Sequence, residues 1–153
     1  MRARVISEKT ELVDVIQRCR FCHLSMVDTE GHPYVIPMNF GFRDDVIYLH
    51  GARHGKKIDI LKQHPVVCIN FTTDHLLRYQ NEQVACSWSM KYRSVLCYGA
   101  AEFITDPEEK IAAFHIVMAQ YTGGEFKFNP PAIKEVCVWK VKILKFEGRA
   151  YGY

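Results

Sequence analysis

Long hydrophobic runs are missing from this chain of 153 residues. Its apolar stretches last only a few residues, whereas a membrane-spanning helix needs ~20. Residues 1–8 contain charged side chains from Arg2 onward and no apolar stretch of signal-peptide length. We therefore expect no membrane segment and a location in the cytoplasm. Repeats, linkers and low-complexity segments are also missing, so residues 1–153 are expected to form a single domain.

An excess of charge of one sign is missing too. Lysine and arginine number 20 and aspartate and glutamate 17, which gives a net charge of +3. This weak basicity gives no reason to expect a nucleic-acid partner. The chain has no Gly-x-Gly-x-x-Gly motif and no Walker lysine loop, which weighs against Rossmann and P-loop nucleotide binding. Positive charge is concentrated only in residues 53–57.

Paired metal-ligand motifs are scarce. Of the six cysteines, only Cys19 and Cys22 have Cys-x-x-Cys spacing. A tetrahedral zinc site would need two more ligands, and no second Cys-x-x-Cys pair is present. A redox pair would open a helix, whereas this one follows a helical pattern. We therefore expect no metal site and structural cysteines, with metal or redox use of Cys19 and Cys22 as the alternative.

Hydrophobic periodicity predicts a mainly β protein with added helices. Short strands joined by close turns favour an antiparallel barrel over an alternating parallel sheet. Strands are expected at residues 22–27, 33–42, 46–50, 66–71, 93–105 and 136–146, with 84–90 as a seventh. Helices are expected at residues 8–19, 55–63 and 107–121, and residues 73–83 are predicted to form a loop.

A few residues carry more specific predictions. Ser7 is a candidate N-cap for the first helix, and Asp106 followed by Pro107 starts the last one. Pro37 marks an edge strand or a bulge, and Gly99 a bend or bulge. The apolar face of the last helix is expected to consist of Ile111, Phe114, His115, Met118 and Tyr121.

The segment from 48 to 59 has the features of an anion site. A strand ends there, small residues follow, and Lys56 and Lys57 open a helix. A helix N-terminus offers free N–H groups and partial positive charge, and the lysines add full charges for a phosphate. Cations are otherwise unfavourable at this helix end, which supports a bound anion. The alternative is that both lysines are simply solvated.

Two further segments could contact a ligand. Arg93 and Ser94 begin a long strand, where a guanidinium and a hydroxyl could reach a phosphate or a polar ring edge. The alternative for Arg93 is a surface ion pair. Pro37 interrupts strand pairing and could leave backbone groups near Met38 and Asn39 free for a ligand, with an ordinary edge strand as the alternative.

Three sequence patterns occur in order: Pro-Tyr-Val-x-Pro-x-Asn from Pro33, Tyr-x-His-Gly-Ala-x-x-Gly-Lys-Lys-Ile-Asp from Tyr48, and Tyr-Arg-Ser-Val-x-x-x-Gly-x-Ala-Glu from Tyr92. Together they resemble the FMN-binding split-barrel proteins, and within these the pyridoxamine 5′-phosphate oxidase-related branch that includes nitroimidazole-resistance proteins. The resemblance covers nearly the whole chain. It implies an antiparallel split β-barrel and a homodimer with two FMN molecules at the subunit interface.

The resemblance also implies a role for each matching residue. The strand that contains Val35, Pro37, Met38 and Asn39 would pass the flavin ring, and His50, Gly51 and Ala52 would line the flavin. Lys56 and Lys57 would hold the phosphate. Arg93 and Ser94 would contact the ring or the ribityl chain. His50 matches a histidine that nitroimidazole-resistance relatives place near the flavin, and its ordinary pKa suits a proton donor near neutral pH. The alternative is that His50 only packs beside the cofactor.

The expected activity follows from the same resemblance. FMN would take electrons from NADH or NADPH and pass them to a small acceptor such as a nitroaromatic or a quinone. The chain lacks the C-terminal Arg-x-His-type motif of true pyridoxamine phosphate oxidases, which argues against vitamin B6 oxidation. The alternatives are a non-catalytic FMN carrier or sensor, and a haem-binding relative that would use His23, His75 or His115.

Overall fold

The computed structural model describes residues 2–153 and contains nine strands and four α-helices. The strands are β1 (Ala3–Ile6), β2 (Cys22–Val27), β3 (Pro33–Met38), β4 (Gly41–Arg43), β5 (Val46–Gly51), β6 (Val66–Arg78), β7 (Ser89–Ile104), β8 (Cys137–Lys142) and β9 (Lys145–Tyr151). The helices are α1 (Lys9–Arg18), α2 (Lys56–Gln63), α3 (Pro107–Ala119) and α4 (Pro130–Glu135). Among residues 2–153, no helix is both long and apolar enough to cross a membrane.

All the strand pairs are antiparallel, which confirms the predicted barrel class. The strand order is β3-β2-β6-β7-β8-β5-β4, and β9 pairs with both β7 and β1. Strand β7 belongs to both halves of the barrel, because Tyr98 pairs with β6 and β9 while Ala101 pairs with β8. The two end strands, β3 and β4, follow each other in the chain but do not pair. The barrel is therefore split between them.

The core fills the space between the two halves of the barrel. Phe40, Phe71 and Trp139 are its largest fully buried side chains, and the rings of Phe40 and Phe71 meet edge to face at 4.8 Å. Helix α1 adds its apolar side to the same cluster through Val15 and Ile16. Each such side chain stabilises the fold by roughly 1.5–3 kcal/mol through burial.

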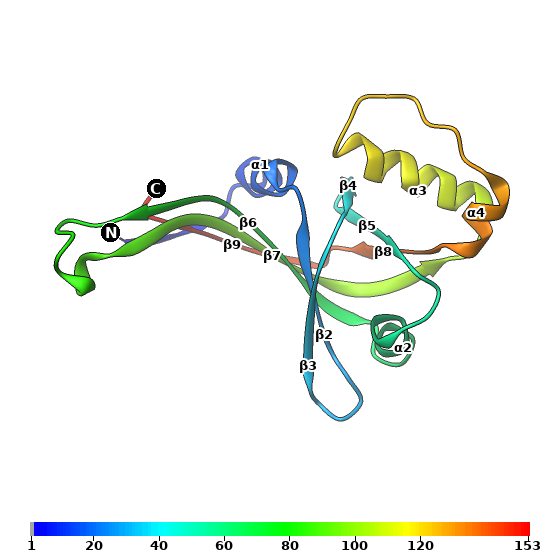
Figure 1. Cartoon of the computed structure of the whole chain (residues 1–153), viewed down its shortest axis with the longest axis horizontal. Coiled ribbons are helices and arrows are strands. Elements are labelled where there is room, and N and C mark those ends of the chain that lie inside the picture. The colour runs from blue at the N-terminus through cyan, green and yellow to red at the C-terminus, as the bar shows by residue number, and fades with distance from the viewer. Residues whose placement is uncertain (1) are drawn as a thin grey trace.

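The β6–β7 hairpin extends far beyond the barrel, away from α2, α3 and α4, and both chain ends lie beside it (Figure 1). The prediction that residues 73–83 form a loop is therefore wrong for residues 73–78, which belong to β6, and confirmed for residues 79–83. Strand β6 passes through an irregularity after Thr73 and pairs with β7 again from Leu76 onward. Asp74 lies at this irregularity and has a positive φ of 59°, a backbone conformation that the local sequence pattern does not reveal.

Several predicted elements differ from the observed ones. The expected strand at 33–42 divides into β3 and β4, and the one at 136–146 divides into β8 and β9. Residues 84–90 hold a short 3-10 helix, Ala85–Ser87, before β7 begins. Strand β1 and helix α4 were not predicted. Pro37 lies on an end strand in regular register with His23, so the edge prediction is confirmed and no bulge is present there.

Helix α3 starts as predicted but buries a different side. The Asp106 carboxylate accepts a hydrogen bond from the Glu109 N–H at 2.9 Å, which confirms the cap. The buried apolar residues are Ala113, Ile116 and Val117 rather than the predicted face, because apolar side chains occur all round this helix. At the N-terminus of α1, Glu8 occupies the cap position instead of Ser7.

Gly99 does not form the predicted bend or bulge. It pairs in regular register with Val67 in the ladder between β6 and β7. A Cβ at this position would collide with the backbone carbonyl oxygen of Lys142. Glycine is therefore required for the close approach of the chain after β8, which is a different reason from the one that the sequence suggested.

Candidate functional site

The split of the barrel brings two of the predicted segments together. Gly41 of β4 pairs with Tyr48 of β5, and this is the last pair of the ladder at the end nearer to β3. Continued along the two chains, its register would place Asn39 opposite His50. At that point β3 has separated from β5 and pairs only with β2. The end of β3 therefore lies at the split, where the chain crosses to β4 and so to the neighbour of β5.

Lys57 lies across the end of β5. Its Nζ is 2.9 Å from the point where a Cβ on Gly51 would stand. A side chain at position 51 would therefore push this flexible ammonium group aside. Helix α2 thus places one full positive charge directly beside the strand end.

Lys56 points to the hairpin between β2 and β3 instead. Its ammonium lies 5.0 Å from the centroid of the Tyr34 ring. Within residues 2–153, neither Lys56 nor Lys57 forms an ion pair with a carboxylate. The chief cause that lowers the pKa of Asp28 is the hydrogen bond from the His32 N–H, and the charge of Lys56 contributes less. Both lysine charges are therefore available to an anion.

The N-terminus of α2 has no side-chain cap. Gly55 occupies the cap position with a φ of 118°, a conformation that favours glycine. The Gly55 carbonyl accepts hydrogen bonds from the Ile58 and Asp59 N–H groups. The first N–H groups of a helix have no partner inside the helix, so this end presents donors as well as lysine charges. An anion site here stays a prediction, which these donors and charges favour.

His50 lies on the side of β5 that faces α3. It pairs with Val138 of β8, and its ring centroid is 4.9 Å from that of Phe114. Burial lowers the pKa of His50 below its ordinary value, and the nearby charge of Lys57 lowers it further. The imidazole is therefore mostly neutral near pH 7. It packs against an aromatic ring, and its pKa depends on the charge of Lys57.

The remaining predicted residues near the split differ in exposure. Met38 is buried in the core, whereas the side chains that are exposed are Val35, Pro37, Asn39 and Ala52. Val35 pairs with Ser25 and Ser25 with Cys68, so these residues point to the outer face of the sheet. Ser94 lies on this same outer face, because its β6 partner, Thr72, is four residues from Cys68.

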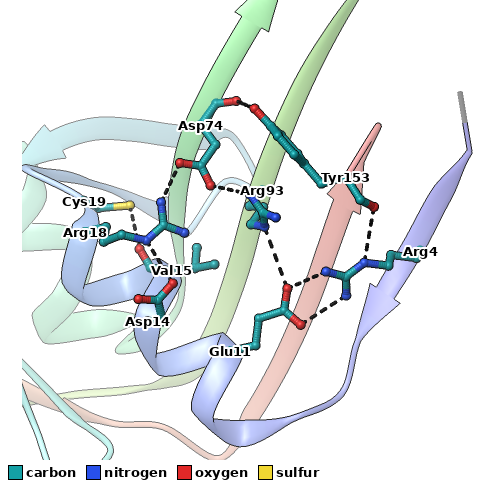
Figure 2. Close-up of polar contacts among 9 residues, drawn as sticks. All are labelled: Arg4, Glu11, Asp14, Val15, Arg18, Cys19, Asp74, Arg93 and Tyr153. Carbon is teal, nitrogen blue, oxygen red and sulfur yellow. Dashed lines mark hydrogen bonds and ion pairs between the residues drawn. The ribbon is translucent and has the colours of Figure 1, made fainter.

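Arg93 points to the opposite side of β7, where carboxylates surround it (Figure 2). Its Nη1 donates to Asp74 at 2.7 Å, and its Nε lies 3.7 Å from Glu11. The guanidinium also lies 4.1 Å from the centroid of the Tyr153 ring. The ion pair that the sequence left as an alternative is therefore present. Within one chain, Arg93 lies beside α1 and is not gathered with Lys56 and Lys57.

The Arg93 contacts belong to a larger network that the sequence did not suggest. Glu11 also binds Arg4 at 2.5 Å, and Asp74 also binds Arg18 (Figure 2). These contacts lower the pKa of Asp74, first through Arg18 and then through Arg93. The network joins β1, α1, β6 and β7 at the root of the long hairpin. No local motif marks these residues, because they come from four separate parts of the chain.

The predicted position of Tyr121 is wrong. It was expected on the apolar face of the last helix, but it follows the end of α3 and is partly exposed. Its hydroxyl oxygen accepts a hydrogen bond from the Phe40 N–H at 3.0 Å. Tyr121 therefore fixes the chain where it crosses the split from β3 to β4.

Within residues 2–153, Cys19 and Cys22 belong to no group of three potential metal ligands. Burial raises the pKa of Cys19 to about 11 and that of Cys22 to about 12, so both remain protonated thiols, which favours the structural interpretation. Within residues 2–153, the single grouping of three potential metal ligands is Asp28, Glu30 and His32 on an exposed turn.

Comparison with known proteins supports the resemblance. The family model described as pyridoxamine 5′-phosphate oxidase matches residues 8–150. No curated protein matches at comparable stringency. A candidate 5-nitroimidazole antibiotic resistance protein from Bacteroides thetaiotaomicron has a solved structure with 40% identity and a TM-score of 0.88, covering 97% of this chain and 87% of that one.

Two more distant solved structures share the fold. The flavocytochrome Anf3 from Azotobacter vinelandii has 20% identity and a TM-score of 0.82, with 99% of this chain and 70% of that chain covered. A FAD-binding protein from Mesorhizobium loti has 21% identity and a TM-score of 0.71, with 99% of this chain and all of that chain covered. At these identities the likeness concerns the fold alone.

Proposed function

The chain belongs to the pyridoxamine 5′-phosphate oxidase family of flavin-binding split barrels, and from this premise we propose that it is an FMN-dependent oxidoreductase. The observation that supports this most directly is the pair of lysines at the uncapped N-terminus of α2. Lys56 and Lys57 have no carboxylate partner within residues 2–153, and Lys57 lies against Gly51. A single terminal phosphate suits this arrangement of charges and N–H donors, which favours FMN among the flavins.

The flavin ring would lie along the opening of the split, beside the outer face of the sheet. There it would meet Val35, Pro37 and Asn39 from the end of β3, with Met38 behind them in the core. Gly51 and Ala52 would line the other border. Because these residues belong to two chain segments held by the barrel, the ring position would be fixed by the fold.

We propose that the functional unit is a homodimer with the flavin at the subunit interface. The outer face of the sheet exposes Val35 by 55% and Val66 by 73%. The exposed apolar side chains on this face are Val5, Val27, Val35, Val66, Leu77 and Met90. Exposed apolar surface of this extent is typical of an interaction site. Ser94 lies on the same face, whereas Arg93 points to the opposite side of β7, and its contact to the ring or ribityl chain stays a prediction.

The flavin would supply the redox chemistry, taking electrons from NADH or NADPH and passing them to a nitroaromatic or quinone. The nitroaromatic acceptor is supported by the 40% identity to the candidate 5-nitroimidazole resistance protein. We propose His50 as the proton donor. Burial and then the charge of Lys57 lower its pKa, and a bound phosphate would offset the second of these causes. We propose that residues 1–153 form one domain and that it works in the cytoplasm.

A flavin carrier or sensor is the second candidate. The contact between His50 and Phe114 favours it, because a histidine that only packs against a ring gives no proton-transfer group. The two candidates differ in turnover. A carrier would bind FMN but would not be reduced by NADH or NADPH at a rate that supports catalysis.

The test begins with the visible spectrum of the purified protein and chromatography of the released chromophore. We expect FMN, its bleaching by one reduced nicotinamide, reoxidation by a nitroimidazole or quinone, and the mass of a dimer in solution. Flavin that neither nicotinamide reduces would favour the carrier. A colourless protein that does not take up added FMN, or a haem spectrum, would contradict the cofactor assignment.

A further inference from the structure

A second cavity lies on the other side of α2, between α2, α3, α4 and β8. Its volume is about 260 Å³. Four basic side chains line it, namely Arg53, Lys62, Lys110 and Lys134. None of the residues that the proposed function assigns to the flavin lines this cavity, because α2 presents Ile58 and Lys62 to it. The cavity therefore shares no lining residue with the proposed flavin site, although Cys137 on its wall pairs with Gly51 of β5.

Lys110 is the unusual member of this group. It is the one charged residue within residues 2–153 that is buried, with an exposed fraction of 9%. Its ammonium donates hydrogen bonds to the carbonyl oxygens of Val136 at 2.8 Å and Ile133 at 3.3 Å. In this part of the chain no carboxylate lies within ion-pair distance of it. A buried charge without a counter-charge is costly, and an anion in the cavity would supply one.

The other cations leave the cavity positive. Arg53 is paired with Glu135 at 3.1 Å, whereas Lys62 and Lys134 have no carboxylate partner among residues 2–153. The Cys137 thiol on the cavity wall senses the same charges. Burial raises the pKa of this thiol, and the cations act in the opposite direction, Lys110 first and Lys62 next. The positive side chains therefore converge on one volume.

The rest of the cavity wall is mostly apolar. Ile58, Ile104 and Val138 contribute buried side chains to it, and Phe103 and Val136 contribute half-buried ones. A ligand with a hydrocarbon body would cover the apolar surface that Phe103 and Val136 leave in water, whereas an inorganic anion would not. The volume lies just under the ~300 Å³ at which drug-sized ligand pockets begin, so the ligand is small.

We propose that this cavity is a second binding site, which takes a small organic carboxylate with a compact apolar body such as a single ring. The carboxylate would approach the Lys110 ammonium, with Lys62 and Lys134 at the entrance. The apolar body would rest chiefly on Phe103 and Val136. The occupant would be a ligand distinct from the flavin, bound on the far side of the helix that holds the flavin phosphate.

The test is calorimetric titration of the purified protein, as isolated, with sodium benzoate at constant ionic strength. Benzyl alcohol and inorganic phosphate serve as comparison ligands, because the first lacks the charge and the second lacks the ring. We expect one benzoate per chain, bound at least about tenfold more tightly than either comparison ligand, since one charge-assisted contact is worth about this factor. The flavin absorbance is followed during the titration and is expected to stay unchanged.

Lys110→Met keeps the length of the side chain and removes the charge, and we expect at least about a tenfold loss of benzoate affinity. The double variant Lys62→Gln/Lys134→Gln changes only exposed residues and gives the same test without touching the buried site. Lys142→Gln, on the exposed side of β8 and outside the cavity, is the matched control and is expected to bind benzoate normally.

Three results would overturn the proposal. These are benzoate binding that is equal in the Lys110→Met and parent proteins, benzoate binding no tighter than that of both comparison ligands, and benzoate binding that changes the flavin spectrum. The last result would place benzoate on the flavin site. Loss of flavin binding with normal benzoate binding would contradict the proposed function alone.

Discussion

Lys57 and Arg93 are both cations of motifs that predict cofactor contacts, but their surroundings differ. Lys57 lies against Gly51 and has no carboxylate partner within residues 2–153, whereas Arg93 donates to Asp74 at 2.7 Å and lies 3.7 Å from Glu11. A motif therefore identifies a positive charge, and the tertiary contacts decide whether an anionic ligand can use it. We infer that the lysine pair holds the phosphate, while Arg93 chiefly holds the long hairpin to α1.

The double variant Lys56→Ala/Lys57→Ala should have the largest effect. Each charge-assisted contact to a phosphate is worth about 1.5–3 kcal/mol, so we expect FMN affinity to fall by at least about 100-fold. Fluorescence titration of the apoprotein with FMN measures this loss. Circular dichroism should remain that of the parent, because both side chains lie outside the core.

Lys127→Ala/Lys142→Ala is the matched control, since it removes the same charge from two exposed lysines away from α2. It should leave FMN affinity within error of the parent value. An equal loss in the two double variants would mean that net charge, rather than a phosphate contact, governs binding.

Asp74→Asn tests the other half of the comparison. Asparagine tolerates the positive φ of 59° at this position, so the change removes charge and little else. Arg18 and Arg93 would then lose their shared carboxylate, and we expect the free energy of unfolding near pH 7 to fall by about 1–2 kcal/mol, allowing for partial solvent screening. Urea unfolding measures it, and FMN affinity should change much less than in the lysine variant.

The same variant should alter the acid dependence of stability. The pKa of Asp74 is lowered by Arg18 and then Arg93, so its contribution is present above its ordinary pKa and is lost as the pH falls through the folded-state value. Asp74→Asn should therefore lose less stability than the parent on acidification. A parallel loss in both proteins would show that the carboxylate does not stabilise the hairpin.

His50 should give the smallest effect. Burial and then Lys57 lower its pKa, so protonation disfavours the folded state, and stability is lost as the pH falls below the ordinary value of about 6.5. His50→Phe should remove this part of the pH dependence in the apoprotein. NMR titration of the ring should also show a higher pKa in Lys57→Met, and an unchanged pKa there would separate His50 from the anion site.

Elements with strong local patterns could be predicted from the sequence. Strand β2 and the Asp106 cap were predicted with their bounds or partners, because alternation and capping depend on neighbouring residues. Helix α2 was placed to within one residue. The split at Asn39 and His50 entered only through the resemblance, since it depends on where two end strands separate.

Features that depend on distant contacts could not be predicted. The continuation of β6 beyond Asp74 depends on pairing with β7, and the buried side of α3 depends on its packing against β4 and β5. The Asp74 network joins residues from four parts of the chain, so no spacing reveals it. The closeness of Lys57 to Gly51 is likewise a tertiary fact, although the motif pointed to both residues.

The central claim, that Lys56 and Lys57 bind the flavin phosphate, is tested most directly by comparing FMN with riboflavin, which lacks the phosphate. Their affinities are measured for the parent apoprotein and for Lys56→Ala/Lys57→Ala. The account predicts that the parent prefers FMN by at least about 100-fold and that this preference nearly disappears in the variant. A preference for FMN that is the same in both proteins would contradict it.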